Sequence, residues 1–291
     1  MIKLKHLSIK LIFAFVLLFL CLFSQNQILA DTALINNTKL YYEIAGKGET
    51  VVLIHGGLAD SRLWDAQFAE FAKYFRVIRY DLRGYGKSEF PNGEFSHIED
   101  LYGLLKFLKV KKASLVGLSI GGVIAADFTI EHPEMVDKLI LSSSGLRGDT
   151  TPADQKTIEV YKAVQAQAKE KAIDLWLENP LFSTIKDNPQ NEQKTRQMLA
   201  DNYKYWAAIE KPIPVKWAKQ QTIERLSEIK KPTLIIVGDK DAPNILAIAE
   251  TLNKKINGSQ KKIITNVSHH LNLEKPKEYN QIVIDFLKKK K

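Results

Sequence analysis

The sequence predicts an α/β protein with a mostly parallel β-sheet flanked by helices. From Asp31 onward, short runs rich in β-branched apolar residues alternate with longer helical patterns, which is typical of parallel sheets covered by helices. The length of 291 residues suits one large domain or a domain that carries an insertion. The 45% hydrophobic and 26% charged residues are ordinary globular values, so composition argues against a disordered chain and against a polytopic membrane protein.

The first 30 residues have the pattern of a signal peptide. Lys3, Lys5 and Lys10 precede an apolar run over residues 11–23, and a polar stretch then ends at Ala30. We therefore expect export, periplasmic or secreted, after cleavage near Ala30. An uncleaved anchor is the alternative, but this run is shorter than the roughly 20 residues that span a bilayer. Membrane contact is expected only through the signal peptide.

The single cysteine and the net charge restrict the partners of the mature chain. Cys21 lies in the predicted signal peptide after bulky Leu20, which argues against a lipoprotein site, and no disulfide can form without it. The net charge is +9, and loss of the three signal lysines leaves 39 basic and 33 acidic residues, or +6. The lysines that remain in the mature chain are scattered and no nucleic-acid motif accompanies them, so we expect no nucleic-acid partner.

Six apolar runs are expected to form consecutive strands of the sheet. An alternating segment over residues 38–44 precedes them and is expected to form an antiparallel edge pair with a lost or weaker neighbour. The six runs are residues 50–54, 76–80, 113–117, 138–142, 233–237 and 262–265.

A helical insertion separates the fourth and fifth of these strands. Residues 147–230 carry no strand pattern, and apolar residues recur there at spacings of three and four over three segments. Such an insertion would cap the carboxyl ends of the strands, where ligands of open α/β sheets bind. The expected helical segments are 156–177, 192–209 and 216–229. The expected domains are a signal peptide over 1–30, a core over 31–146 and 231–291, and a helical cap over 147–230.

The pentapeptide Gly117-Leu118-Ser119-Ile120-Gly121 marks a candidate nucleophile. A predicted strand runs directly into it and a helical pattern runs directly out, which is the setting of a nucleophile elbow. The glycines are needed because a strained turn brings neighbouring backbone close. Ser119 is therefore the expected catalytic nucleophile.

A serine hydroxyl needs a base and a carboxylate, and both follow in the order Ser, Asp, His. Asp239 and Asp241 come after the fifth strand, and His269 and His270 after the sixth. Both groups lie beyond the carboxyl ends of their strands, on the same edge of the sheet as Ser119. The pattern alone leaves open which aspartate and which histidine act.

The loop after the first long strand is expected to help bind an oxyanion. It reads His55-Gly56-Gly57-Leu58. The N–H group of Gly57, or alternatively of Leu58, together with that of Ile120, would donate to the tetrahedral oxyanion. The expected role of His55 is structural.

Together these motifs resemble the α/β-hydrolase superfamily over nearly all of residues 38–287. The resemblance implies the α/β-hydrolase fold and assigns the catalytic triad to Ser119, Asp241 and His269. One departure is Ser268, because the family usually has Gly before this histidine, which leaves His270 as a rival. The motifs are His55-Gly56-Gly57, the turn from Asp81 to Ser88, the elbow around Ser119, and the segment from Ser268 to Pro276.

Within the superfamily, residues 61–65 and 178–206 look most like the β-ketoadipate enol-lactone hydrolase and carboxylesterase branch. The resemblance implies a serine esterase that cleaves small-molecule carboxylic esters or lactones through an acyl-enzyme, and the signal peptide favours a substrate met outside the cytoplasm, so the expected protein is secreted. A serine at the elbow, in place of aspartate, argues against dehalogenase and epoxide hydrolase chemistry. No cofactor and no metal is expected, and Asp81 and Arg83 are expected to organise a loop.

Three aromatic residues of the cap are candidates for the substrate pocket: Trp176, Phe182 and Trp206. The alternative is that each simply packs the cap against the sheet. Rival functions are a ligand-binding homologue without catalysis, and a lipase or thioesterase of the same fold.

Overall fold

The computed structural model describes residues 28–151, 155–208 and 215–289. Most of the predicted signal peptide, residues 1–27, lies outside these ranges. Within them, no helix combines the length and the apolar character needed to cross a membrane.

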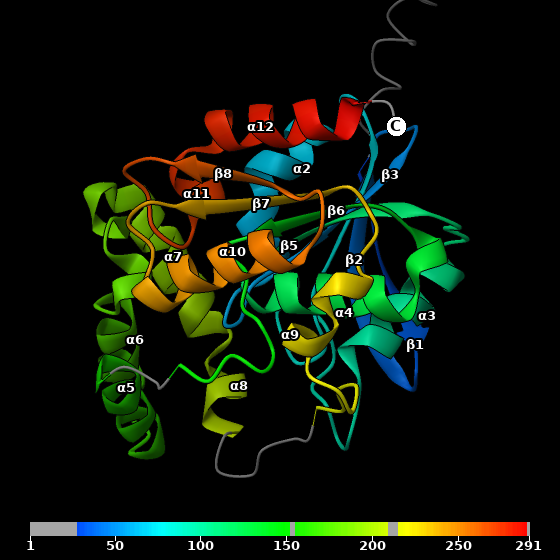
Figure 1. The fold of residues 1–291 in the computed structure, drawn as a ribbon. Helices are drawn as coiled ribbons and strands as arrows, with labels where there is room; N and C mark the ends of the chain where they lie inside the picture. Colours follow the sequence, from blue (N-terminus) through cyan, green and yellow to red (C-terminus); the bar gives the residue numbers. More distant parts are fainter. Residues whose placement is uncertain (1–27, 152–154, 209–214, 290–291) are drawn as a thin grey trace, which may run out of the picture.

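The centre of the molecule is one eight-stranded sheet with the order β1-β2-β4-β3-β5-β6-β7-β8 (Figure 1). The pairs β1/β2 and β2/β4 are antiparallel, and every other neighbouring pair is parallel. The predicted mostly parallel sheet is therefore confirmed, and all six predicted runs are strands. The strands are β1 (Leu29–Ile35), β2 (Thr38–Ala45), β3 (Thr50–Ile54), β4 (Arg76–Tyr80), β5 (Ala113–Leu118), β6 (Val136–Ser142), β7 (Thr233–Gly238) and β8 (Gln260–Ile264).

Residues 38–44 form the expected antiparallel pair at the edge of the sheet, but the expectation of a lost or weak neighbour was wrong. β1 pairs with β2 along its whole length and forms the edge of the sheet, while β2 lies inside it. The connection is a two-residue turn at Asn36 and Asn37, both with positive φ, as the tight turns that match strand twist require. Because β1 begins at Leu29, the predicted cleavage near Ala30 falls inside this strand.

Helices cover both faces of the sheet (Figure 1). On one face, α2 (Asp65–Phe71) packs against α12 (Pro276–Lys288). On the other lie α3 (His97–Phe107), α4 (Ile120–Glu131) and α10 (Pro243–Lys255). A layer of buried apolar side chains fills each interface and stabilises the fold by removing apolar surface from water.

The helices that follow β6 lie at the end of the sheet toward which the arrowheads of β7 and β8 point (Figure 1). We call α5 (Gln155–Gln165), α6 (Lys169–Leu177), α7 (Pro189–Asp201) and α8 (Tyr203–Ala207) the inserted helices. The single helical segment expected over 156–177 is two helices, because Gln167 has a φ of 55°, which ends a helix. The remaining short helices are α9 (Thr222–Arg225), α11 (Leu271–Glu274), η1 (Ser61–Trp64), η2 (Pro133–Met135), η3 (Pro180–Phe182), η4 (Ile185–Asp187) and η6 (Leu226–Glu228).

Candidate active site

Ser119 lies at a sharp turn between β5 and α4. Its backbone has φ 56° and ψ −118°, a conformation that costs energy for a residue with a side chain and is concentrated at functional sites. The carbonyl of Ser119 accepts hydrogen bonds from the N–H groups of Gly122 at 2.9 Å and Gly145 at 3.1 Å, which fixes the turn. The strand-turn-helix setting expected from the pentapeptide is present.

The two outer glycines of the pentapeptide permit this turn because other backbone passes close to them. A Cβ atom at position 117 would lie 2.6 Å from the amide nitrogen of Gly122. One at position 121 would lie 2.6 Å from the carbonyl oxygen of His55 and closer still to that of Ile54. Real Cβ atoms do not approach backbone that closely, so a side chain at either position would displace β3 or α4.

We expect Gly121→Ala to lower the free energy of unfolding by about 3 kcal/mol, as overpacking against immobile backbone does. The matched control is Gly93→Ala, since a Cβ atom at Gly93 would meet nothing within 4 Å. Urea unfolding of both variants measures the difference. Equal stability of the two variants would contradict the close approach of β3 to the elbow.

His269 and Asp241 form a buried pair at the ends of β8 and β7. His269 Nδ1 lies 3.1 Å from Asp241 Oδ1 and 3.2 Å from Oδ2, and Oδ1 also accepts from the N–H of Ala242 at 2.8 Å. Since a carboxylate only accepts, Nδ1 carries the proton and Nε2 is free to accept one. In contrast, Asp239 accepts from the N–H of Asn266 at 2.6 Å and so ties two loops together.

Ser268, the departure from the family pattern, is well accommodated. Its hydroxyl and its N–H donate to Glu274 Oε1 at 2.9 and 3.1 Å, and the other oxygen of Glu274 bonds to the Thr184 hydroxyl. The N–H of His269 donates to the carbonyl of Leu181 at 3.0 Å. The segment that follows α6 therefore holds the loop of His269 from two sides.

The loop after β3 lies directly against the elbow. A Cβ atom at Gly56 would be 3.4 Å from Ser119 Cβ, and one at Gly57 would be 3.8 Å from the Ile120 side chain, so both residues lie in contact with the elbow. Within the described ranges the Gly57 N–H has no protein acceptor, and the N–H of Ile120, the first residue of α4, has none within its helix. Gly57 and Ile120, the residues expected to supply the oxyanion donors, both line a cavity that Ser119 also lines.

His55 is structural, as expected, and its hydrogen bonds define its tautomer. Nε2 accepts from the N–H of Leu82 at 2.9 Å, so the proton is on Nδ1, which donates to the carbonyl of Gly56 at 2.7 Å. Burial lowers the pKa of His55, which keeps this arrangement at neutral pH. His55 thereby connects the Gly56-Gly57 turn to the loop after β4.

Asp81 and Arg83 organise that loop, which confirms the structural expectation for both. Asp81 accepts from the N–H groups of Ser61 and Lys87, each at 2.8 Å. Arg83 makes two hydrogen bonds to the buried carboxylate of Asp100, at 2.6 and 2.8 Å. Neither residue lines the cavity described next.

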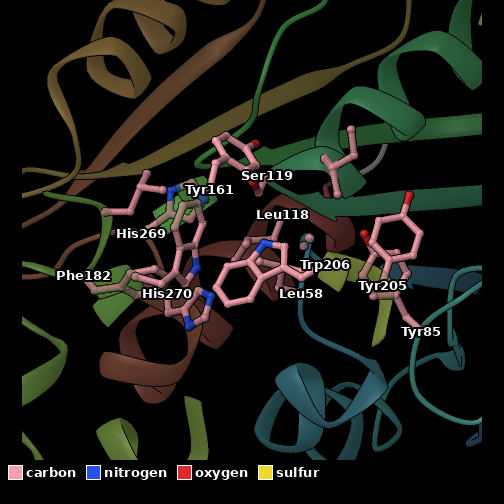
Figure 2. A pocket seen from close by; sticks show the side chains of 15 residues that line it. Leu58, Tyr85, Leu118, Ser119, Tyr161, Phe182, Tyr205, Trp206, His269 and His270 are labelled. Carbon is pink, nitrogen blue, oxygen red and sulfur yellow. The ribbon is translucent and has the colours of Figure 1, made fainter. Parts of the chain in front are cut away.

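Ser119 and His269 line two cavities: one of about 410 Å³, and one of about 390 Å³ whose wall includes side chains of the inserted helices and is drawn in Figure 2. The three aromatic residues predicted for the pocket all line the latter. Sequence reasoning did not identify Tyr85 and Tyr161 as lining residues, and it considered Leu58 only as an alternative oxyanion donor and His270 only as a rival base. The full lining of this cavity is Gly56, Gly57, Leu58, Tyr85, Leu118, Ser119, Ile120, Tyr161, Trp176, Leu181, Phe182, Tyr205, Trp206, His269 and His270.

The chemistry of this lining is aromatic and uncharged. The rings of Tyr85 and Tyr205 pack at an interplanar angle of 34° with centroids 4.2 Å apart, and Trp176 meets Trp206 edge-on at 5.5 Å. Among the described residues, no lysine, arginine, aspartate or glutamate lines the cavity. In the described ranges, no hydrogen bond joins the Ser119 hydroxyl to His269. Hydrogen bonds between a nucleophile and its base often form fully only when substrate is bound. The arrangement offers a hydroxyl, a charge-paired imidazole and two backbone donors around an apolar space.

Comparison with known proteins identifies the family. Residues 49–276 match the family described as alpha/beta hydrolase fold, so the chain belongs to this family. Uncharacterized proteins of Mycobacterium tuberculosis and Mycobacterium bovis are 37% identical to it over 107 residues. That match covers 36% of the chain and 31% of the length of these relatives.

The structural neighbours include esterases and lactonases. Est816, described as an N-acyl homoserine lactone degrading enzyme, is 28% identical, with a TM-score of 0.74 over 88% of this chain and 100% of that one. An enol-lactonase from Burkholderia xenovorans LB400 is 25% identical, with a TM-score of 0.76 over 89% of this chain and 100% of the other. A thermophilic esterase from Thermogutta terrifontis is 28% identical, with a TM-score of 0.73 over 89% of this chain and 98% of that one.

Proposed function

We propose that this protein is an exported serine hydrolase that cleaves uncharged carboxylic esters or lactones through an acyl-enzyme. The observation that carries the proposal is the buried Asp241–His269 hydrogen bond at the cavity that also holds Ser119. Similarity to esterases and lactonases supports ester bonds as the target. The signal-peptide pattern of residues 1–30 supports export.

In this proposal His269 acts first as a base. Its Nε2 takes the Ser119 proton as the serine oxygen attacks the acyl carbonyl, and the carbonyl π electrons move to the oxygen. Asp241 holds the imidazole in the required tautomer and stabilises the imidazolium. The N–H groups of Gly57 and Ile120 stabilise the oxyanion, whose charge exists only near the transition state.

The tetrahedral intermediate then collapses and breaks the bond to the leaving alkoxide oxygen. His269 donates its proton to that oxygen, so an alcohol leaves and Ser119 carries the acyl group as an ester. Water repeats the sequence in the second half: His269 takes its proton, the hydroxide attacks the acyl carbon, and Ser119 regains its proton. For a lactone the alcohol stays attached to the acyl group, and the product is a hydroxy acid.

We assign the acyl group to the cavity that Gly57 and Ile120 line, next to the expected oxyanion donors, and the alcohol part to the second cavity that Ser119 and His269 also line. A carboxylate on that acyl group would enter a space without a cationic side chain among the described lining residues. Burial of an unpaired charge costs several kcal/mol. The proposed substrates are therefore uncharged in their acyl part.

We expect kcat/KM for the p-nitrophenyl ester of succinate to be at least about 100-fold lower than for p-nitrophenyl butyrate, since the succinate ester has an unpaired carboxylate. The release of p-nitrophenol, with spontaneous hydrolysis subtracted, measures both. The matched control is the methyl ester of the same succinate, which removes the charge and restores the rate. Equal rates for the charged and the uncharged ester would contradict an uncharged acyl site.

A further inference from the structure

His270 forms part of the cavity wall next to the histidine of the buried pair. Its ring meets Phe182 edge-on at a centroid distance of 5.0 Å and lies 6.2 Å from the ring of His269. Only 5% of the residue is exposed. Figure 2 shows Phe182, His269 and His270 on one side of Trp206, with Tyr85 and Tyr205 on the other. His270 is therefore a polar group in the part of the cavity wall that Phe182 forms.

The two ring nitrogens of His270 have different surroundings. Nδ1 lies 3.5 Å from the hydroxyl of Thr195, a buried residue of α7. Nε2 of His270 has no hydrogen-bond partner across the described ranges. It is not among the fully buried atoms that lack a partner, unlike Nδ1 of His97. Because His270 lines the cavity and no described residue bonds to Nε2, we take this nitrogen as the one that can make a hydrogen bond to a bound molecule.

His270 remains uncharged at every pH at which the enzyme would be assayed. Burial, and to a lesser degree the neighbouring His269, lowers the pKa of His270 to about 3. A neutral imidazole has one N–H and one bare nitrogen, so it cannot neutralise a carboxylate. It can donate to, or accept from, an uncharged polar group.

An entirely apolar ligand would leave this nitrogen without a partner. A hydrocarbon chain packed against Phe182 would displace the water that can reach Nε2 and offer nothing in return. An unpaired buried polar group has a desolvation cost, whereas a ligand atom that completes the hydrogen bond avoids it. The cavity therefore favours an acyl group with a polar atom at this position.

We propose that His270 determines specificity by hydrogen-bonding, through Nε2, an uncharged ether, carbonyl or amide group in the acyl part of the substrate. This inference rests on the proposed function, because that function places the acyl group in this cavity. It narrows the substrate class to esters or lactones whose acyl part has a second, neutral polar group.

The test compares p-nitrophenyl hexanoate with a series in which one chain methylene at a time is replaced by an ether oxygen or a ketone. Each kcat/KM is divided by the alkaline hydrolysis rate of the same ester, which removes differences in intrinsic reactivity. For one position in the series we expect the wild type to favour the oxygenated ester about fivefold to tenfold, the value of one neutral hydrogen bond. His270→Phe should reduce the ratio to about one, and His270→Gln should retain part of it.

The control variant is Trp176→Phe, which changes the cavity wall without removing a group next to His270. It should alter the rates for both esters in the same way and leave their ratio unchanged. Calorimetric binding of the same esters to Ser119→Ala, with and without His270→Phe, gives a measurement that does not need turnover.

The outcomes separate the two proposals. A wild-type ratio of one at every position, or a preference that survives His270→Phe, overturns the role of His270 while the hydrolase remains. If no ester is cleaved, the proposed function fails, and the binding preference still decides the role of His270. Should His270→Phe not fold, the wild-type ratio and His270→Gln decide it.

Discussion

Replacement of Ser119 with alanine is expected to lower kcat/KM for p-nitrophenyl butyrate by at least about 10⁴-fold, because the variant lacks the atom that forms the acyl-enzyme. The oxyanion donors and the aromatic cavity would remain, so substrate binding should change little. Initial rates of p-nitrophenol release, measured at high enzyme concentration, give the residual activity.

The matched control is Ser144→Ala in the loop after β6. The Ser144 hydroxyl donates to the carbonyl of Gly145 and does not line the cavity, so we expect its loss to change kcat/KM by less than about threefold. Comparable losses in the two variants would indicate that the elbow region is sensitive to any change, and would remove the special role of Ser119.

Asp241→Asn is expected to lower kcat by about 10⁴-fold, the loss seen when the carboxylate of a triad becomes an amide. The amide has no charge to stabilise the imidazolium, and its NH₂ group can face Nδ1 and force the proton onto Nε2. His269 then cannot accept the serine proton. Steady-state kinetics on the same ester measure the effect.

Asp239→Asn provides the comparison within the same loop. Asp239 accepts a hydrogen bond from the N–H of Asn266 through Oδ1, which an asparagine oxygen preserves, so we expect nearly unchanged kcat. If the two variants exchanged these results, Asp239 would be the acid of the triad and the choice of Asp241 would be wrong.

The sheet could be predicted from sequence because most of its strands are buried on both faces. Their β-branched runs stand out from the helical patterns between them, and six runs match strands in the structure within a few residues. β1 was missed because Leu29–Ile35 spans the expected cleavage site and was assigned in part to the signal peptide. The break at Gln167 was missed because a positive φ at glutamine has no local signal.

The candidate site was predictable where local motifs place residues at strand ends. Spacing alone could not choose between His269 and His270, because adjacent residues of a loop point in directions that only the fold determines. The structure pairs His269 with Asp241 and directs His270 toward Thr195. Tyr85 was missed as a cavity residue because its motif has a structural role in the loop, which gives no indication that this residue lines the cavity.

The cavity depends on contacts between segments far apart in the sequence. Tyr85 comes from the loop after β4 and Tyr205 from α8, and their rings are in contact. Such pairs follow from tertiary packing, which a linear pattern of apolar residues does not encode. For this reason the candidate nucleophile was accessible from sequence, whereas the lining of the proposed acyl site, including His270, required the structure.

The most direct test of the central claim is covalent labelling of the wild-type protein with an alkyl fluorophosphonate, which phosphonylates a serine oxygen activated by a neighbouring base. We predict that intact mass increases by one phosphonyl group, that peptide mapping places it on Ser119, and that Ser119→Ala and Asp241→Asn react far more slowly. An unlabelled wild-type protein, or a label on another residue, would contradict Ser119 as the nucleophile.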